Sequence, residues 1–248
     1  MVSLALAACC PPAFAQTASS ETQRSASVGG EITFGSGHAD RGFIVSDRPV
    51  IQPEVWVSDH GTDVSLWSSF TLVETTDRSR PMILELELSH DVEWKRLTLT
   101  PSVTMVSYHD ALSTAYDRTI ETWLYLSYDL GPLQLITNHS LDILANAGAY
   151  HGEAGIQSEW HVSPALELGG SFGTGWASAK FNDDYAGVGI SALDYVSAEA
   201  WLTVHVSSRF YFGPHIEFST IVDRRVRAGP DVVRPTYVLI GLATGGEF

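Results

Sequence analysis

The sequence predicts an all-β fold, a single transmembrane antiparallel β-barrel of twelve strands with both termini periplasmic. Three observations carry this prediction. Apolar and polar residues alternate with a period of two, the connections between these segments differ regularly in length, and no run of about 18 apolar residues is present to span a bilayer as a helix. Because lipid offers the backbone no hydrogen-bond partners, a membrane protein without such helices must close its strands into a barrel.

Turn-forming residues divide the chain into twelve strand-like segments. The predicted strands are residues 28–36, 50–59, 62–74, 82–94, 97–109, 118–130, 133–144, 149–162, 165–178, 192–206, 210–223 and 236–248. Short connections lie at 59–62, 95–96, 131–132, 163–164 and 207–209, and long ones at 37–49, 75–81, 110–117, 179–191 and 224–235. Short turns on one side and long loops on the other are typical of barrels with periplasmic turns and extracellular loops. Pro53, Pro101 and Pro214 each remove a ladder donor, so we expect bulges or local breaks there.

The two faces of the predicted strands differ in chemistry. In 82–94 the even positions are mostly apolar, whereas the odd positions carry most of the acids, and 210–223 divides in a similar way. These apolar faces are too numerous to share one small core, so we expect them to face lipid while the polar faces line a wet lumen. Aromatic residues on the apolar face lie near both strand ends, as membrane–water interfaces favour. They are Trp94, Tyr128, Trp160, Phe210 and Phe248 at the turn end, and Phe34, Phe70, Tyr150 and Trp176 at the loop end.

The first residues read as a targeting segment. A short apolar stretch ends in Ala13-Phe14-Ala15, a small-x-small cleavage site before Gln16, so we predict a signal peptide over 1–15, a polar periplasmic extension over 16–27 and the barrel over 28–248. Leu6-Ala7-Ala8-Cys9 also resembles a lipoprotein box, which leaves lipidation of Cys9 as an alternative. Both cysteines fall in this segment, so we expect no disulfide and no thiolate metal site in the mature chain.

The face predicted to line the lumen is acidic, whereas Lys and Arg collect in the predicted loops. A carboxylate-lined passage concentrates cations and repels anions, and the net charge of −15 argues against nucleic acid as a partner. We expect the loop arginines to meet lipopolysaccharide phosphates, although Arg41 or Arg48 could fold inward and line a constriction. The predicted pore-lining residues are Glu54, Trp67, Glu85, Glu87, Asp91, Glu121, Trp123, Glu153, Glu199, Trp201, His215 and Glu217.

These features favour a porin-like channel for passive diffusion of small polar solutes, with a preference for cations and no cofactor. Two alternatives stay open. One is a structural barrel whose lumen is plugged, with its acids solvated and its aromatic side chains filling the bore. The other is an outer-membrane lipid-modifying hydrolase, using either a loop site or His205 and Ser207, which share one face two residues apart. Pairs such as Glu159/His161 have a spacing that could bind a metal, yet no metal signature stands out.

Two stretches resemble known proteins. The final strand, TYVLIGLATGGEF over 236–248, ends on Phe248 and resembles the assembly signal of bacterial outer-membrane β-barrel proteins. That likeness implies a location in the bacterial outer membrane and recognition by the barrel assembly machinery. Residues 41–69, with Arg41-Gly42 at the start and two alternating strands around Gly61, resemble the N-terminal hairpin of the TorF-type porins. This second resemblance implies a barrel with a transport role.

Overall fold

In a computed structural model of the chain, the structure describes residues 26–72, 81–110 and 116–248. The predicted signal peptide and nearly all of the predicted extension lie outside the described residues, as do most of the predicted loop 75–81 and part of the loop 110–117.

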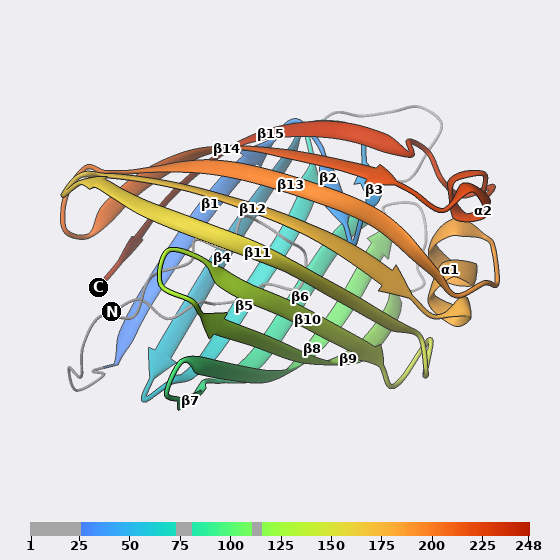
Figure 1. The fold of residues 1–248 in the computed structure, drawn as a ribbon, viewed down its shortest axis with the longest axis horizontal. Helices are drawn as coiled ribbons and strands as arrows, with labels where there is room; N and C mark the ends of the chain where they lie inside the picture. The colour runs from blue at the N-terminus through green and yellow to red at the C-terminus, as the bar shows by residue number, and fades with distance from the viewer. Residues whose placement is uncertain (1–25, 73–80, 111–115) are drawn as a thin grey trace.

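The described chain forms a closed antiparallel barrel (Figure 1). Strand β1 pairs with both β4 and β15, and β6 pairs with β8, which closes the ring of hydrogen-bonded neighbours. Strand β7 continues the line of β6 along β8, so the wall has the twelve strands that the sequence predicts. The wall strands are β1 (Ser27–Gly35), β4 (Val50–Asp59), β5 (Thr62–Thr71), β6 (Pro81–His90) with β7 (Val92–Trp94), β8 (Leu97–Asp110), β9 (Tyr116–Asp129), β10 (Gln134–Asp142), β11 (Tyr150–Ser163), β12 (Leu166–Ala177), β13 (Ala192–His205), β14 (Phe210–Ile221) and β15 (Thr236–Glu247).

Pro53, Pro101 and Pro214 each coincide with a gap in one ladder rather than with a bulge. The β6–β8 and β7–β8 ladders share one register but stop at Ser89↔Ser102 and resume at Val92↔Leu99, with Pro101 in the gap. A proline has no N–H to donate across the ladder, which accounts for the split between β6 and β7. The β4–β5 and β13–β14 ladders skip Pro53 and Pro214 in the same way. The register shifts of the wall instead lie in β11–β12 and β12–β13.

Three of the long connections contain structure of their own. The predicted loop 37–49 forms a hairpin of β2 (His38–Asp40) and β3 (Phe43–Ser46), and the loops 179–191 and 224–235 contain the helices α1 (Ala179–Ala186) and α2 (Arg224–Arg227). Helix α1 begins at the N-cap Ser178 and ends at Gly187, whose φ of 68° suits glycine. Both helices lie at the loop end of the barrel (Figure 1). Neither of these described helices has the length and hydropathy needed to cross a membrane.

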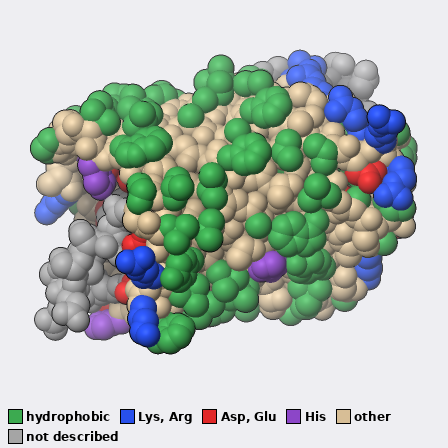
Figure 2. Space-filling model, in the orientation of Figure 1, with side chains coloured by type: hydrophobic (Ala, Val, Ile, Leu, Met, Phe, Trp, Pro, Cys, Tyr) green, Lys and Arg blue, Asp and Glu red, His purple; other side chains and the backbone are tan. Residues whose placement is uncertain are grey.

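The exterior of the wall is apolar. Leu88, Trp160 and Ile240 are each more than half exposed, and Figure 2 shows hydrophobic side chains over the wall with Lys and Arg gathered toward its ends. Soluble monomers rarely expose apolar patches larger than roughly a few hundred Å². This exterior is that of a membrane-embedded barrel, in agreement with the predicted location in the outer membrane.

The first residues of β1 and the last residues of β15 lie beside the short β4–β5 turn, since Ser27 pairs with Ser58 and Gly29 with Glu247.

Candidate functional site

The β2–β3 hairpin folds into the lumen instead of extending away from the barrel. Its two tip residues, Arg41 and Gly42, have φ values of 49° and 84°, which are the positive angles that a two-residue type I′ turn requires. Gly42 lies so close to β13 that an added Cβ would be 2.2 Å from Cδ1 of Tyr195. The hairpin therefore starts beside β1 and reaches β13 with its tip.

Arg41 fixes the tip through charge. Its guanidinium lies 2.7 Å from Oε2 of Glu121 and 3.3 Å from Oδ1 of Asp40, and its side chain is only 7% exposed. The guanidinium carbon is also 4.8 Å from the ring centroid of Trp123. Tyr185 of α1 donates a hydrogen bond of 2.9 Å to the other oxygen of Asp40. Two carboxylates and an aromatic face thus surround the buried guanidinium and compensate its charge away from water.

The rest of the hairpin is held by side chains on both of its faces. His38 Nδ1 lies 2.9 Å from the side-chain nitrogen Nε2 of Gln52, and the ring centroids of His38 and Trp67 are 5.6 Å apart. Phe43 contacts the rings of Phe181 and Tyr185. Val45 packs against the buried cluster of Trp67, Ile83 and Val106. Arg48, in contrast, stays 54% exposed beside Asp47, so Arg41 is the arginine that folds inward.

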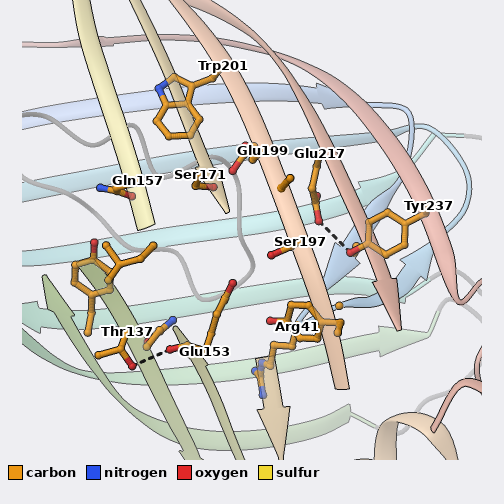
Figure 3. Close-up of a pocket in the computed structure, with 17 residues that line it drawn as sticks. Arg41, Thr137, Glu153, Gln157, Ser171, Ser197, Glu199, Trp201, Glu217 and Tyr237 are labelled. Atoms are coloured by element: carbon orange, nitrogen blue, oxygen red, sulfur yellow. Dashed lines mark hydrogen bonds between the residues drawn. The ribbon is translucent and has the colours of Figure 1, made fainter. Parts of the chain in front are cut away.

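Beside the hairpin tip, the lumen holds a cavity of about 120 Å³ (Figure 3). Of the residues predicted to line a pore, four line this cavity: Glu153, Glu199, Trp201 and Glu217. Glu199 and Glu217 lie directly opposite each other on β13 and β14. Tyr237 donates a hydrogen bond of 3.0 Å to Glu217. The lining of the cavity contains three carboxylates, a tryptophan, several hydroxyl groups and, at the hairpin tip, the guanidinium of Arg41.

The other eight predicted residues also lie on the inner side of the wall, in different surroundings. Glu121, Trp123 and Trp67 contact the hairpin. Glu54, Glu85 and Glu87 are buried on β4 and β6, with Glu87 accepting a hydrogen bond of 3.1 Å from Thr104. Asp91 accepts one of 2.7 Å from Thr100 at the β6–β7 break, and His215 lies over Gly241. Their role as a pore lining stays a prediction.

Sequence reasoning missed three aromatic residues that lie inside the barrel at its loop end. Phe181 and Tyr185 lie on α1, which has only eight residues and no strong apolar period to reveal it. Tyr195 was missed as well, although the alternation of 192–206 placed it on the inner face.

Asp223, the residue before α2, is ionised. Hydrogen bonds from Arg225 lower the pKa of Asp223 to about 2, so this carboxylate stays charged and caps α2.

Large rings of the lumen lie over glycines on the neighbouring strand. Trp201 covers Gly169, where an added Cβ would be 2.1 Å from Cε2 of the indole, and Trp56 covers Gly29 in the same way. Because glycine has no side chain, each ring can lie along the wall. These aromatic residues therefore take up less of the bore than their volume alone implies.

The side chains of His205 and Ser207 contact other groups and do not form a nucleophile–base pair with each other. The Ser207 hydroxyl oxygen accepts hydrogen bonds from the backbone N–H groups of Arg209 and Phe210, at 3.2 and 3.1 Å. His205 Nε2 lies 3.4 Å from Oε1 of Glu167. A serine that accepts within its own turn is a common turn device, and neither contact joins Ser207 to His205.

The fold and the site together define a transmembrane β-barrel of the outer-membrane type with a narrowed, acidic lumen. No protein-family model matches the chain, and neither does any curated protein. Among solved structures, the chain is similar to the COG4313 outer membrane channel from Pseudomonas putida F1, at 10% identity and a TM-score of 0.52 over 94% of this chain and 100% of that one. It is also similar to the KdgM porin, at 7% identity and a TM-score of 0.50 over 90% of this chain and 98% of that one. At these identities the likeness is one of fold.

Replacing Arg41 tests how the hairpin is held. Arg41→Ala leaves the carboxylates of Asp40 and Glu121 facing each other without their cation, and loss of one partner of a buried pair typically costs about 3–5 kcal/mol. We expect the hairpin to leave its docked position. Hydrogen exchange of the backbone amides of residues 38–46, followed by mass spectrometry, should become much faster.

Arg48→Ala is the matched control, because Arg48 is exposed and makes only a surface ion pair. We expect its hairpin amides to exchange as in the unaltered protein. Equal protection in the Arg41→Ala protein would show that the ion pair does not hold the hairpin.

Proposed function

We propose that the protein is an outer-membrane channel for passive diffusion of small polar solutes, and that it prefers cations. The observation that carries the proposal is the acidic cavity at the hairpin, where Glu153, Glu199 and Glu217 line one space. Among the wall-strand residues that the structure describes, the single Lys or Arg is Arg118, which is exposed and on the outward parity. The inner faces of these strands thus contribute carboxylates but neither Lys nor Arg.

The pairing of the strands strengthens the charge argument. Glu199 lies opposite Glu217, and Glu31 lies opposite Glu54. Like charges directly opposite in a ladder repel each other, so a cation between them lowers the electrostatic energy. The low-dielectric wall focuses this field along the lumen. Arg41 adds one positive charge, which Asp40 and Glu121 already engage.

The docked hairpin occupies part of the bore, which favours the passage of small solutes over large ones. One of the similar structures is described as the KdgM porin in complex with disordered oligogalacturonate. Such a ligand is a polyanion, which the acids of this lumen would repel. We therefore expect solutes of different charge for this protein.

The proposal includes the orientation of the barrel in the membrane and its partners. Turns face the periplasm with both termini, and loops face outward, where the exposed Arg224, Arg225 and Arg227 meet lipopolysaccharide phosphates. Strand β15 and the Phe248 that follows it are recognised by the barrel assembly machinery. The resemblance of residues 41–69 to the TorF-type porins is in keeping with a transport role.

A plugged structural barrel is the second candidate function. The observation that favours it is the same hairpin, which is held on both faces and fills the lumen next to Trp67 and Trp123. The two candidates differ in whether ions cross the unaltered barrel.

Planar-bilayer recordings across a salt gradient test the channel proposal. We expect a reversal potential that reports cation preference. In the triple variant Glu153→Gln, Glu199→Gln, Glu217→Gln the preference should fall, because three carboxylates of the cavity become neutral at nearly constant volume.

The matched control removes three acids outside the cavity: Asp59→Asn, Asp129→Asn and Asp231→Asn, all of which are exposed. It should keep the cation preference of the unaltered channel. Anion preference in the unaltered protein would overturn the charge argument, and a repeated absence of conductance would favour the plugged barrel.

The ring over Gly169 gives a separate test of where solutes pass. In Gly169→Ala the added methyl group occupies the position of the Trp201 indole, so the ring must move into the cavity. We expect a lower single-channel conductance. Gly189→Ala is the control, since its Cβ would meet Asp183 at an ordinary 3.6 Å, and unchanged conductance in both would place the path away from Trp201.

A further inference from the structure

Four side chains with metal-ligating atoms meet at the turn end of the lumen, away from the hairpin. Glu159 and His161 come from β11, Glu167 from β12 and His205 from β13. Nδ1 of His161 lies 3.0 Å from Oε1 of Glu167, and Nε2 of His205 lies 3.4 Å from the same oxygen. One ligand atom each from Glu159, His161 and Glu167 lie within 4.8 Å of one another.

Strand pairing explains why these residues meet. His161 pairs with Glu167 across the β11–β12 ladder, and Glu159 lies two residues before His161 on the same inner face. The register of this ladder shifts between His161 and Ser163. Such irregularities re-aim a side chain and are frequent next to functional sites. His205 is the last residue of β13 and comes next to Glu167 from the other side.

We propose that this cluster is a binding site for a divalent transition-metal ion, with Zn²⁺ as the best match. Imidazole nitrogen and carboxylate oxygen are ligands that Zn²⁺ accepts in tetrahedral geometry at about 2.0–2.2 Å. Two ligand atoms on such a tetrahedron are roughly 3.3 Å apart, and the nitrogen–oxygen separations of 3.0 and 3.4 Å lie on either side of that value.

Charge and access also fit an ion. Two carboxylates this close repel each other, and a divalent cation between them removes that repulsion. Oε1 of Glu159 is buried without a hydrogen-bond partner among the described residues, so it retains its capacity as a ligand. The side chains of His161 and His205 are 59% and 30% exposed, which leaves the cluster reachable from the turn end. A bound ion would tie β11, β12 and β13 together there.

The test is calorimetric titration of ZnCl₂ into the chelator-treated protein in detergent micelles, produced without the predicted signal peptide so that Cys9 and Cys10 do not compete for the ion. We expect one ion per chain and a rise in the thermal unfolding midpoint, because a ligand that binds the folded state stabilises it. The double variant His161→Ala, His205→Ala should bind Zn²⁺ at least roughly tenfold more weakly. Glu167→Gln, which keeps the side-chain volume, should do the same.

His60→Ala, His90→Ala is the matched control, since both histidines are exposed near the same end of the barrel. This control should bind Zn²⁺ as the unaltered protein does, and the circular dichroism of each variant checks that the barrel is intact. The proposal is overturned if the unaltered protein takes up no Zn²⁺. Equal binding by the folded Glu167→Gln protein, or loss of binding in the His60/His90 control, would overturn it as well.

Discussion

A backbone surrounded by lipid must find all of its hydrogen-bond partners within the chain, and this constraint governs the structure. The ladder from β6 through β1 and β15 to β8 meets it by closing on itself. Once the ring is closed, the parity of each strand residue decides whether its side chain meets lipid or the lumen. Where a residue lacks a donor, as Pro101 does, the ladder opens locally while its register continues on both sides.

The closed wall creates an interior that is too polar to pack as an apolar core. Glu199 opposite Glu217 and Glu31 opposite Glu54 place like charges in contact range. Such an arrangement is stable only where water, protons or cations compensate the charge. At the loop end Arg41 compensates two other acids, Asp40 and Glu121, and its ion pair with Glu121 holds the hairpin in the bore. At the loop end, the ion pairs that hold the hairpin in the lumen therefore also balance part of the negative charge there.

The hairpin shows where sequence reasoning reached its limit. The sequence marked both Arg41 and Arg48 as arginines able to fold inward, and sequence reasoning did not decide between them. The structure separates them through partners that are distant in the chain: Glu121 is 80 positions away and Tyr185 contacts the hairpin through Asp40. Likewise, Glu159 and His161 are a weak signal as a pair two residues apart. A possible metal site is formed only with Glu167 and His205, which lie beside this pair on β12 and β13 in the fold.

The sequence alone determined the number of strands, the position of the turns and the chemistry of the two faces. These features follow from a period of two and from turn residues, which are local properties of the chain. The tertiary structure decided which long loop enters the lumen, which of the acids line a cavity and where the helices α1 and α2 form. Those outcomes depend on distances between residues far apart in sequence, and local periodicity carries no information about such distances.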